Sequence, residues 1–141
     1  MVIGSSDESG AYIPVVCAII EQGDCFLAAC RQEHQTNGGL WEFPGGKVKK
    51  MESLEEALAR ELDEELGVGV EIKRQLSAVS WEYPWISITL YPFVTRVCGI
   101  RTPHPIDHCA LRYVTHTEAR TLEWAPADLK ILEEYGRTFS E

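Results

Sequence analysis

The chain has 141 residues, of which 45% are hydrophobic and 25% are charged, so it suits one compact globular domain. Its formal net charge of −9 argues against a general nucleic-acid surface, because such a surface needs clustered lysine and arginine. A phosphorylated small molecule remains compatible with this charge, since a few basic residues or a metal ion can make one site positive.

Several elements are predicted after a polar tail at residues 1–10, which leaves 11–141 as the single domain. Strand patterns fall at 12–20, 25–30, 40–43, 70–81, 86–98 and 110–114. Pro44-Gly45-Gly46 breaks the strand at 40–43, and Tyr83-Pro84-Trp85 is a hairpin turn between the strands at 70–81 and 86–98. Helical patterns fall at 53–66, at 117–120 as a brief turn, and at 126–135 with Gly136 as the stop. This order predicts the α/β (α+β) class, as a mixed β-sheet sandwiched between α-helices.

The N-terminal segment has neither the basic region nor the apolar stretch of a signal peptide. No apolar run reaches the roughly 18 residues that a membrane span needs. The five cysteines lack close metal-ligand spacing, and free thiols are typical of a reducing compartment. We therefore expect a cytoplasmic protein without membrane contact, while its state as monomer or homodimer stays open.

The helix at 53–66 carries an unusual set of acids. Ser53 and Glu56 form the pattern of a capping box, and Gly67 follows where the helix would end. Four leucines spaced four residues apart form one apolar stripe. At about 100° per residue, Glu61 and Glu65 project inside that apolar arc.

Glu64 stands on the flank of the same arc, so three carboxylates crowd an apolar surface beside a Gly-Gly turn. They would repel one another and lose hydration unless a cation neutralised them. Mg²⁺ prefers oxygen ligands of this kind. The alternative is an ordinary solvated acidic face, which three acids against an apolar stripe make less favourable.

The full pattern resembles the signature of the Nudix hydrolases, in which these residue types recur at fixed spacing. The matching positions are Gly46, Glu52, Arg60, Glu61, Leu62, Glu64, Glu65, Gly67 and Val68. This resemblance implies the Nudix fold and hydrolysis of a diphosphate linked to another moiety, with a divalent metal. The ion expected is Mg²⁺, with Mn²⁺ as an alternative.

By the same resemblance, Glu61 and Glu65 would be direct metal ligands, and Glu64 would share the ions directly or through water. The Gly45 carbonyl would add an oxygen ligand, because glycines let the backbone approach closely. Arg60 would hold a neighbouring carboxylate in orientation. Glu52 would support the loop or the outer shell of the metal.

Two basic residues, Lys47 and Arg31, are candidates for holding phosphate oxygens, with a solvated surface cation as the alternative for each. Several family members also carry a glutamate on a late loop, six residues before an aromatic, that serves as metal ligand or general base. Here the aromatic is Tyr113 and the matching position is Asp107. Aspartate is one methylene shorter, so a water-mediated role fits more easily, and an ordinary loop aspartate is the alternative. Met51 replaces a usual glycine in the loop before the helix.

Substrate clues come from outside the signature. Residues 40–47, LWEFPGGK, resemble the MutT-like branch, which cleaves nucleoside triphosphates to monophosphate and pyrophosphate, and they place Phe43 with the substrate-binding residues. Residues 125–128 resemble branch members that act on CTP or oxidised nucleotides, where the position of Asp128 reads the base edge. Tyr83 falls where the branch has an aromatic beside the base.

Asp128 can act in two ways. Ionised, its carboxylate only accepts hydrogen bonds and favours donors such as the cytosine amino group, whereas a protonated acid could donate. A favourable interaction with the helix dipole is the alternative explanation for an aspartate at this place.

We predict a Mg²⁺-dependent nucleoside triphosphate pyrophosphohydrolase that converts CTP-like or oxidised (d)NTPs, such as 8-oxo-dGTP, to monophosphate and pyrophosphate. One alternative is hydrolysis of another nucleoside diphosphate derivative, such as a dinucleoside polyphosphate or a nucleotide sugar. Another is a non-catalytic nucleotide-binding module, which the complete set of signature acids disfavours. The expected partner is a small-molecule nucleotide, with no nucleic acid.

Overall fold

The structure, a computed structural model, describes residues 12–137, so the tail predicted at 1–10 lies outside the described residues. The strands are β1 (Ile13–Gln22), β2 (Cys25–Cys30), β3 (Trp41–Glu42), β4 (Gly45–Lys47), β5 (Val70–Gln75), β6 (Val79–Tyr83), β7 (Ile86–Val97) and β8 (Ala110–Val114). The helices are α1 (Leu54–Leu66), α2 (His116–Ala119) and α3 (Pro126–Arg137). No helix within residues 12–137 is long and apolar enough to cross a membrane.

β1 is the central strand of a mixed sheet. It runs parallel to β7 over the register Ile13↔Ile88 to Ile20↔Thr95, and antiparallel to β2 and β4. β5 and β6 both pair antiparallel with β7, while β3 and β8 flank β2. The predicted mixed sheet is therefore confirmed.

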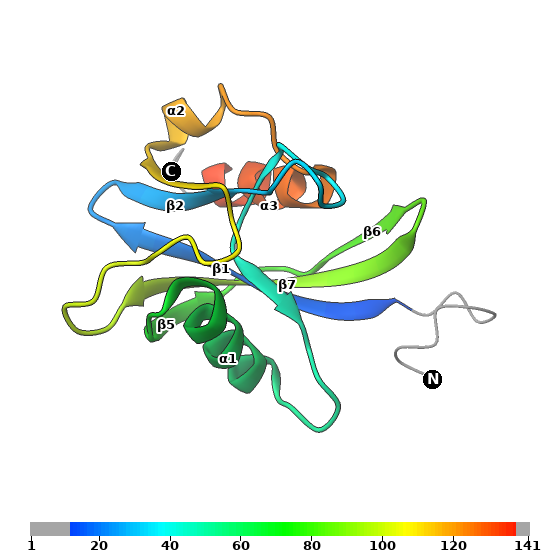
Figure 1. The fold of residues 1–141 in the computed structure, drawn as a ribbon, viewed down its shortest axis with the longest axis horizontal. Helices are drawn as coiled ribbons and strands as arrows, with labels where there is room; N and C mark the ends of the chain where they lie inside the picture. Colours follow the sequence, from blue (N-terminus) through cyan, green and yellow to red (C-terminus); the bar gives the residue numbers. More distant parts are fainter. Residues whose placement is uncertain (1–11, 138–141) are drawn as a thin grey trace.

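Helices cover both faces of this sheet: α1 lies on one side, and α3 with α2 lies on the other (Figure 1). The central strand β1 shows why both layers are needed. Val16 and Ala18 pack in the cluster that includes the buried face of α1, whereas Cys17 and Ile19 pack in the cluster that includes α3. All four are at most 1% exposed, as expected for a strand buried on both faces.

The single strand predicted at 70–81 is wrong, because the structure has two strands there. β5 pairs with the C-terminal half of β7 and β6 pairs with its N-terminal half. β5 and β6 are separated at the point opposite Pro92, which has no N–H to donate to a neighbouring strand. Leu76, at the break, donates its own N–H to the Pro92 carbonyl at 2.9 Å.

Two glycine positions add to the predictions. The break predicted after residues 40–43 is present, since β3 ends at Glu42, but Gly45 and Gly46 then form a new strand, β4, and pair with Cys17 and Val16 of β1. Gly136 was expected to stop the last helix, but α3 continues to Arg137. Gly136 serves packing instead, since a Cβ there would lie 2.2 Å from the His116 ring of α2.

Candidate active site

The caps of α1 set where its acids project. Ser53 accepts from the Glu56 N–H and Glu56 accepts from the Ser53 N–H, so the predicted capping box is present. Gly67 ends the helix in the left-handed region, at φ 72°. The buried residues of the helix are Ala57, Leu58, Leu62 and Leu66.

Arg60 joins three of the signature acids, Glu52, Glu61 and Glu64, into one network. Its Nε and Nη2 donate to Glu52 at 2.6 and 3.0 Å, and its Nη1 donates to Glu61 at 3.0 Å and to Glu64 at 3.4 Å. The guanidinium, together with the Lys49 N–H, lowers the pKa of Glu52 to about 2. Arg60 therefore fixes the orientation of carboxylates on two sides of the site.

Glu65 sits apart from this network and is half-buried against the sheet. Its Oε1 accepts the Gly45 N–H at 3.3 Å. Burial, followed by the nearby charges of Glu42 and Glu61, raises the pKa of Glu65 to about 8. Without a cation this carboxyl can therefore keep its proton at neutral pH.

The glycine pair of β4 is what lets these acids approach the sheet. A Cβ at Gly46 would lie 2.3 Å from the carboxyl carbon of Glu61. A Cβ at Gly45 would lie 1.9 Å from the Val16 carbonyl oxygen of β1. Only glycine fits either position, so the backbone and the acids of α1 face each other directly.

The loop between β7 and β8 binds to the C-terminal end of α1 through its backbone. The His104 N–H donates to the Leu66 carbonyl at 2.9 Å, and the Ile106 N–H donates to the Glu65 carbonyl at 3.2 Å. The loop thereby carries Asp107, which is exposed, close enough for its charge to help raise the pKa of Glu65. The structure thus places Asp107 beside the signature acids.

A cavity of about 410 Å³ opens next to Gly45 and Gly46. Its size lies in the usual range of small-molecule sites. Its lining includes all five residues predicted to bind substrate, namely Arg31, Phe43, Lys47, Tyr83 and Asp128. These residues come from separate parts of the chain and meet only in the folded protein.

Asp128, in the first turn of α3, lines this cavity and is only 7% exposed. Its Oδ2 accepts the Phe43 N–H at 2.9 Å. Burial, followed by the charge of Glu42, raises the pKa of Asp128 well above its ordinary value. Phe43 itself is 2% exposed and packs its ring 4.9 Å from that of Trp124, so it supports the wall of the cavity from the core.

Tyr83 and Trp85 form an aromatic wall. Their rings stack with centroids 5.1 Å apart and an interplanar angle of 13°, and Trp85 is 51% exposed. The Tyr83 hydroxyl accepts the Ala127 N–H at 3.0 Å, which ties β6 to α3. The sequence predicted Trp85 only as a turn residue. Its position two residues after Tyr83 is the signal that could have identified it as part of the aromatic wall.

Glu42 is the acid that the sequence analysis missed. It lines the cavity from β3 and contacts Arg31 Nη1 at 3.4 Å and His108 Nε2 at 2.8 Å. It was part of the quoted LWEFPGGK segment, but its register opposite Ala29 and its contact with His108 become visible only in the fold. Its charge raises the pKa values of both Glu65 and Asp128, so it links the acid cluster to the cavity.

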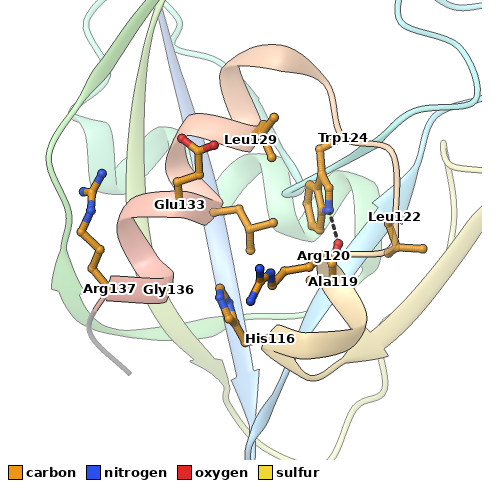
Figure 2. A pocket seen from close by; sticks show the side chains of 10 residues that line it. His116, Ala119, Arg120, Leu122, Trp124, Leu129, Glu133, Gly136 and Arg137 are labelled. Atoms are coloured by element: carbon orange, nitrogen blue, oxygen red, sulfur yellow. Dashed lines mark hydrogen bonds between the residues drawn. The ribbon is translucent and has the colours of Figure 1, made fainter. Parts of the chain in front are cut away.

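A larger cavity, of about 530 Å³, lies between α2 and α3 (Figure 2). Leu129 and Glu133 of α3 line it, as do Ala119 of α2 and Arg120, the residue that follows α2. Neither α1 nor β4 contributes to its lining. It is therefore separate from the acidic site.

No preassembled group of three or more metal-ligand side chains occurs within residues 12–137. Arg60 holds Glu61 and Glu64, while Glu65 bonds to Gly45. The residues nevertheless fit a hard divalent cation, since they offer carboxylate oxygens and a nearby backbone carbonyl. Burial, followed by the charges of Glu42 and Glu61, raises the pKa of Glu65, and a bound cation would favour its ionised form.

A family model described as the NUDIX domain matches residues 11–135. The chain therefore belongs to the Nudix family, as the signature predicted.

Among its relatives is the CTP pyrophosphohydrolase of Escherichia coli (strain K12), 38% identical over 124 residues, which cover 87% of this chain and 90% of the relative. A protein of Mycobacterium tuberculosis named putative 8-oxo-dGTP diphosphatase 2 is 35% identical over 127 residues, 89% of each chain. The solution structure of the E. coli ORF135 protein matches with a TM-score of 0.78 at 36% identity over 89% of each chain. The predicted fold is thus confirmed.

Proposed function

We propose that this protein is a nucleoside triphosphate pyrophosphohydrolase that acts on CTP-like or oxidised (d)NTPs, such as 8-oxo-dGTP. Water would attack phosphorus, the anhydride bond would break, and the products would be a nucleoside monophosphate and pyrophosphate. The observation that carries this proposal is that the signature acids lie next to a cavity lined by aromatic rings and by the carboxyl group of Asp128. The names of the two relatives support the same chemistry.

The metal-binding part would be Glu61, Glu64, Glu65 and the Gly45 carbonyl, with Mg²⁺ or alternatively Mn²⁺. When bound, such an ion neutralises phosphate charge and lowers the pKa of water. Arg60, braced by Glu52, would keep the acids oriented. Asp107 would hold or accept a proton at the edge of the same site.

The substrate-binding part would lie in the 410 Å³ cavity. Lys47 and Arg31 line it and would hold phosphate oxygens. Tyr83 and Trp85 would stack on the nucleobase, and Asp128 would bind its edge. This division separates the groups that act on phosphate from those that select the base.

We also propose that the protein works in a reducing compartment such as the cytoplasm. All five cysteines are free thiols in the structure, and Cys17 and Cys30 are buried. Free thiols of this kind are typical of such compartments.

The test is pyrophosphate release from a nucleotide panel, with Mg²⁺ and with EDTA. The panel holds the common triphosphates, 8-oxo-dGTP, 5-methyl-dCTP, a dinucleoside polyphosphate and ADP-ribose. We expect metal-dependent release that is strongest with a cytidine or an oxidised purine triphosphate. Turnover of only the last two compounds would contradict the proposal.

A further inference from the structure

Glu42 and His108 form a contact that the family signature does not include. The His108 Nε2 lies 2.8 Å from Glu42 Oε2, and the His108 side chain is 3% exposed. An ionised carboxylate can only accept, so the ring donates from Nε2. Within residues 12–137 the other ring nitrogen, Nδ1, is buried without a hydrogen-bond partner. The polar contact of this ring is thus aimed at Glu42.

The sheet explains how two residues 66 positions apart meet. Glu42 lies in β3, directly opposite Ala29 of β2. His108 precedes β8 on the other edge of β2, where the Cys109 N–H donates to the Cys30 carbonyl at 2.9 Å. Residues opposite each other in an antiparallel pair share one face, so Glu42 lies on the face of β2 that carries the small side chain of Ala29. His108, just before β8, meets Glu42 from the other edge of β2.

Arg31 is the other partner of Glu42, but it is a weaker anchor. Its Nη1 is 3.4 Å from both carboxylate oxygens of Glu42, and its side chain is 23% exposed. Its Nε already donates to the Thr36 carbonyl at 2.6 Å. If Arg31 turns to a phosphate, as proposed above, His108 is the contact that keeps Glu42 in place.

We propose that His108 is a positioning residue for base selection, which holds the Glu42 carboxylate toward the cavity so that it accepts a hydrogen bond from an exocyclic amino group of the nucleobase. This inference rests on the proposed function. It assigns to the cavity a preference for bases that carry such a group, as cytosine and adenine do. His108 itself touches no substrate.

The cavity would discriminate between bases because a carboxylate in a fixed position accepts a hydrogen bond from an amino group but repels a keto oxygen. Released from His108, Glu42 could rotate away from the base and lose both effects. The contacts of Arg60 with the signature acids do not involve Glu42 and would be unchanged. The consequence is a change in selectivity rather than a uniform loss.

The test compares kcat and KM for two matched pairs, CTP with UTP and ATP with ITP, which differ at the exocyclic amino position. In His108→Ala we expect the kcat/KM ratio of CTP to UTP to fall about tenfold, mainly through the KM of CTP. His108→Gln, which can restore an N–H donor, should recover much of the ratio. His116→Gln, at a histidine of α2 that lies next to Gly136 of α3, is the matched control and should leave the ratio unchanged.

A double-mutant cycle separates positioning from mere packing. If His108 acts through Glu42, adding His108→Ala to Glu42→Gln should change the CTP-to-UTP ratio little beyond Glu42→Gln alone. Independent, multiplying losses would overturn the proposal, and so would equal losses on CTP and UTP. If His108→Ala does not fold, the same comparison is made with His108→Leu, which fills the space of the ring without an N–H donor, and Glu42→Gln. Failure of the proposed function shows separately, as absence of triphosphate hydrolysis by the unaltered protein.

Discussion

The acid cluster on α1 and the cavity that Asp128 lines are assembled in different ways. Most of the cluster comes from one continuous stretch, residues 45–65, whose spacing on a capped helix already places the acids together. The cavity draws on β3, the β6–β7 turn, the 31–39 loop and α3. The positions of the acids are thus determined by helix periodicity, whereas the cavity depends on which strands pair in the sheet.

This difference has a functional meaning. Changes in the cluster should affect hydrolysis of every substrate, because all substrates present phosphate. Changes in the cavity should affect one base more than another, because they act on KM through base contacts. Mutations in the two regions therefore test whether the protein separates chemistry from selection.

The largest effect is expected from Glu65→Gln. Loss of groups that merely support a metal site costs roughly 10–100-fold, so loss of the ligand proposed here should lower kcat by roughly 100-fold or more for all bases. A steady-state assay on the nucleotide panel measures this. Full activity of Glu65→Gln in Mg²⁺ would contradict the ligand assignment.

The same variant should reveal the raised pKa of Glu65 in metal-free protein. The folded-state value is about 8 against an ordinary 4.5, so ionisation is harder in the folded state and stability is lost as pH rises from about 4.5 to 8. Glu65→Gln removes this loss. Thermal melts in EDTA should show the variant gaining stability over the unaltered protein between pH 5 and pH 8, and a constant difference would contradict the prediction.

Asp128 offers a smaller effect that is confined to the cavity. Because burial raises its pKa, a neutral amide is a close mimic, and Asp128→Asn should change the KM of the preferred triphosphate by no more than about threefold. Asp128→Ala should raise that KM about tenfold and spare kcat. The alanine also leaves the Phe43 N–H buried without its acceptor, which costs about 1–3 kcal/mol in a denaturant melt. Equal losses for all bases would argue against a role in selection.

The smallest effect is expected at Met51, in the loop that leads into α1. Met51 has φ 73° and is 94% exposed, so it bears the cost of a left-handed conformation with little packing in return. That cost is roughly 1–2 kcal/mol, and the extra freedom of unfolded glycine offsets part of it. Met51→Gly should therefore stabilise by less than about 1 kcal/mol in urea unfolding. Lys50→Gly, at a neighbour that lacks positive φ, is the control and should not stabilise.

Sequence reasoning was most successful where neighbours along the chain decide the structure. The capping box at Ser53 and the left-handed Gly67 are local features, and both are confirmed. The mixed sheet between helices followed from the order of elements. The split between β5 and β6 was missed because it depends on Pro92 of a different strand.

The same distinction holds for the site. Asp107 could be placed near the acids from spacing in the family, although hydrogen bonds between its loop and α1 determine where it lies. Glu42 and Trp85 were overlooked because their importance depends on partners from distant segments, His108 and Tyr83. Gly136 was misjudged because His116, not helix termination, requires it.

The hydrogen bonds from His104 and Ile106 to the end of α1 also divide the connection between β7 and β8 into two parts. Before them, Gly99 has φ 75° and Ile100 is fully exposed. Extra residues or a fluorescent tether placed at 99–100 would therefore extend into solvent. Shortening the chain between 104 and 107 would pull on the helix that carries the signature acids. Two adjacent stretches of one loop thus differ sharply in how well they tolerate a change in length.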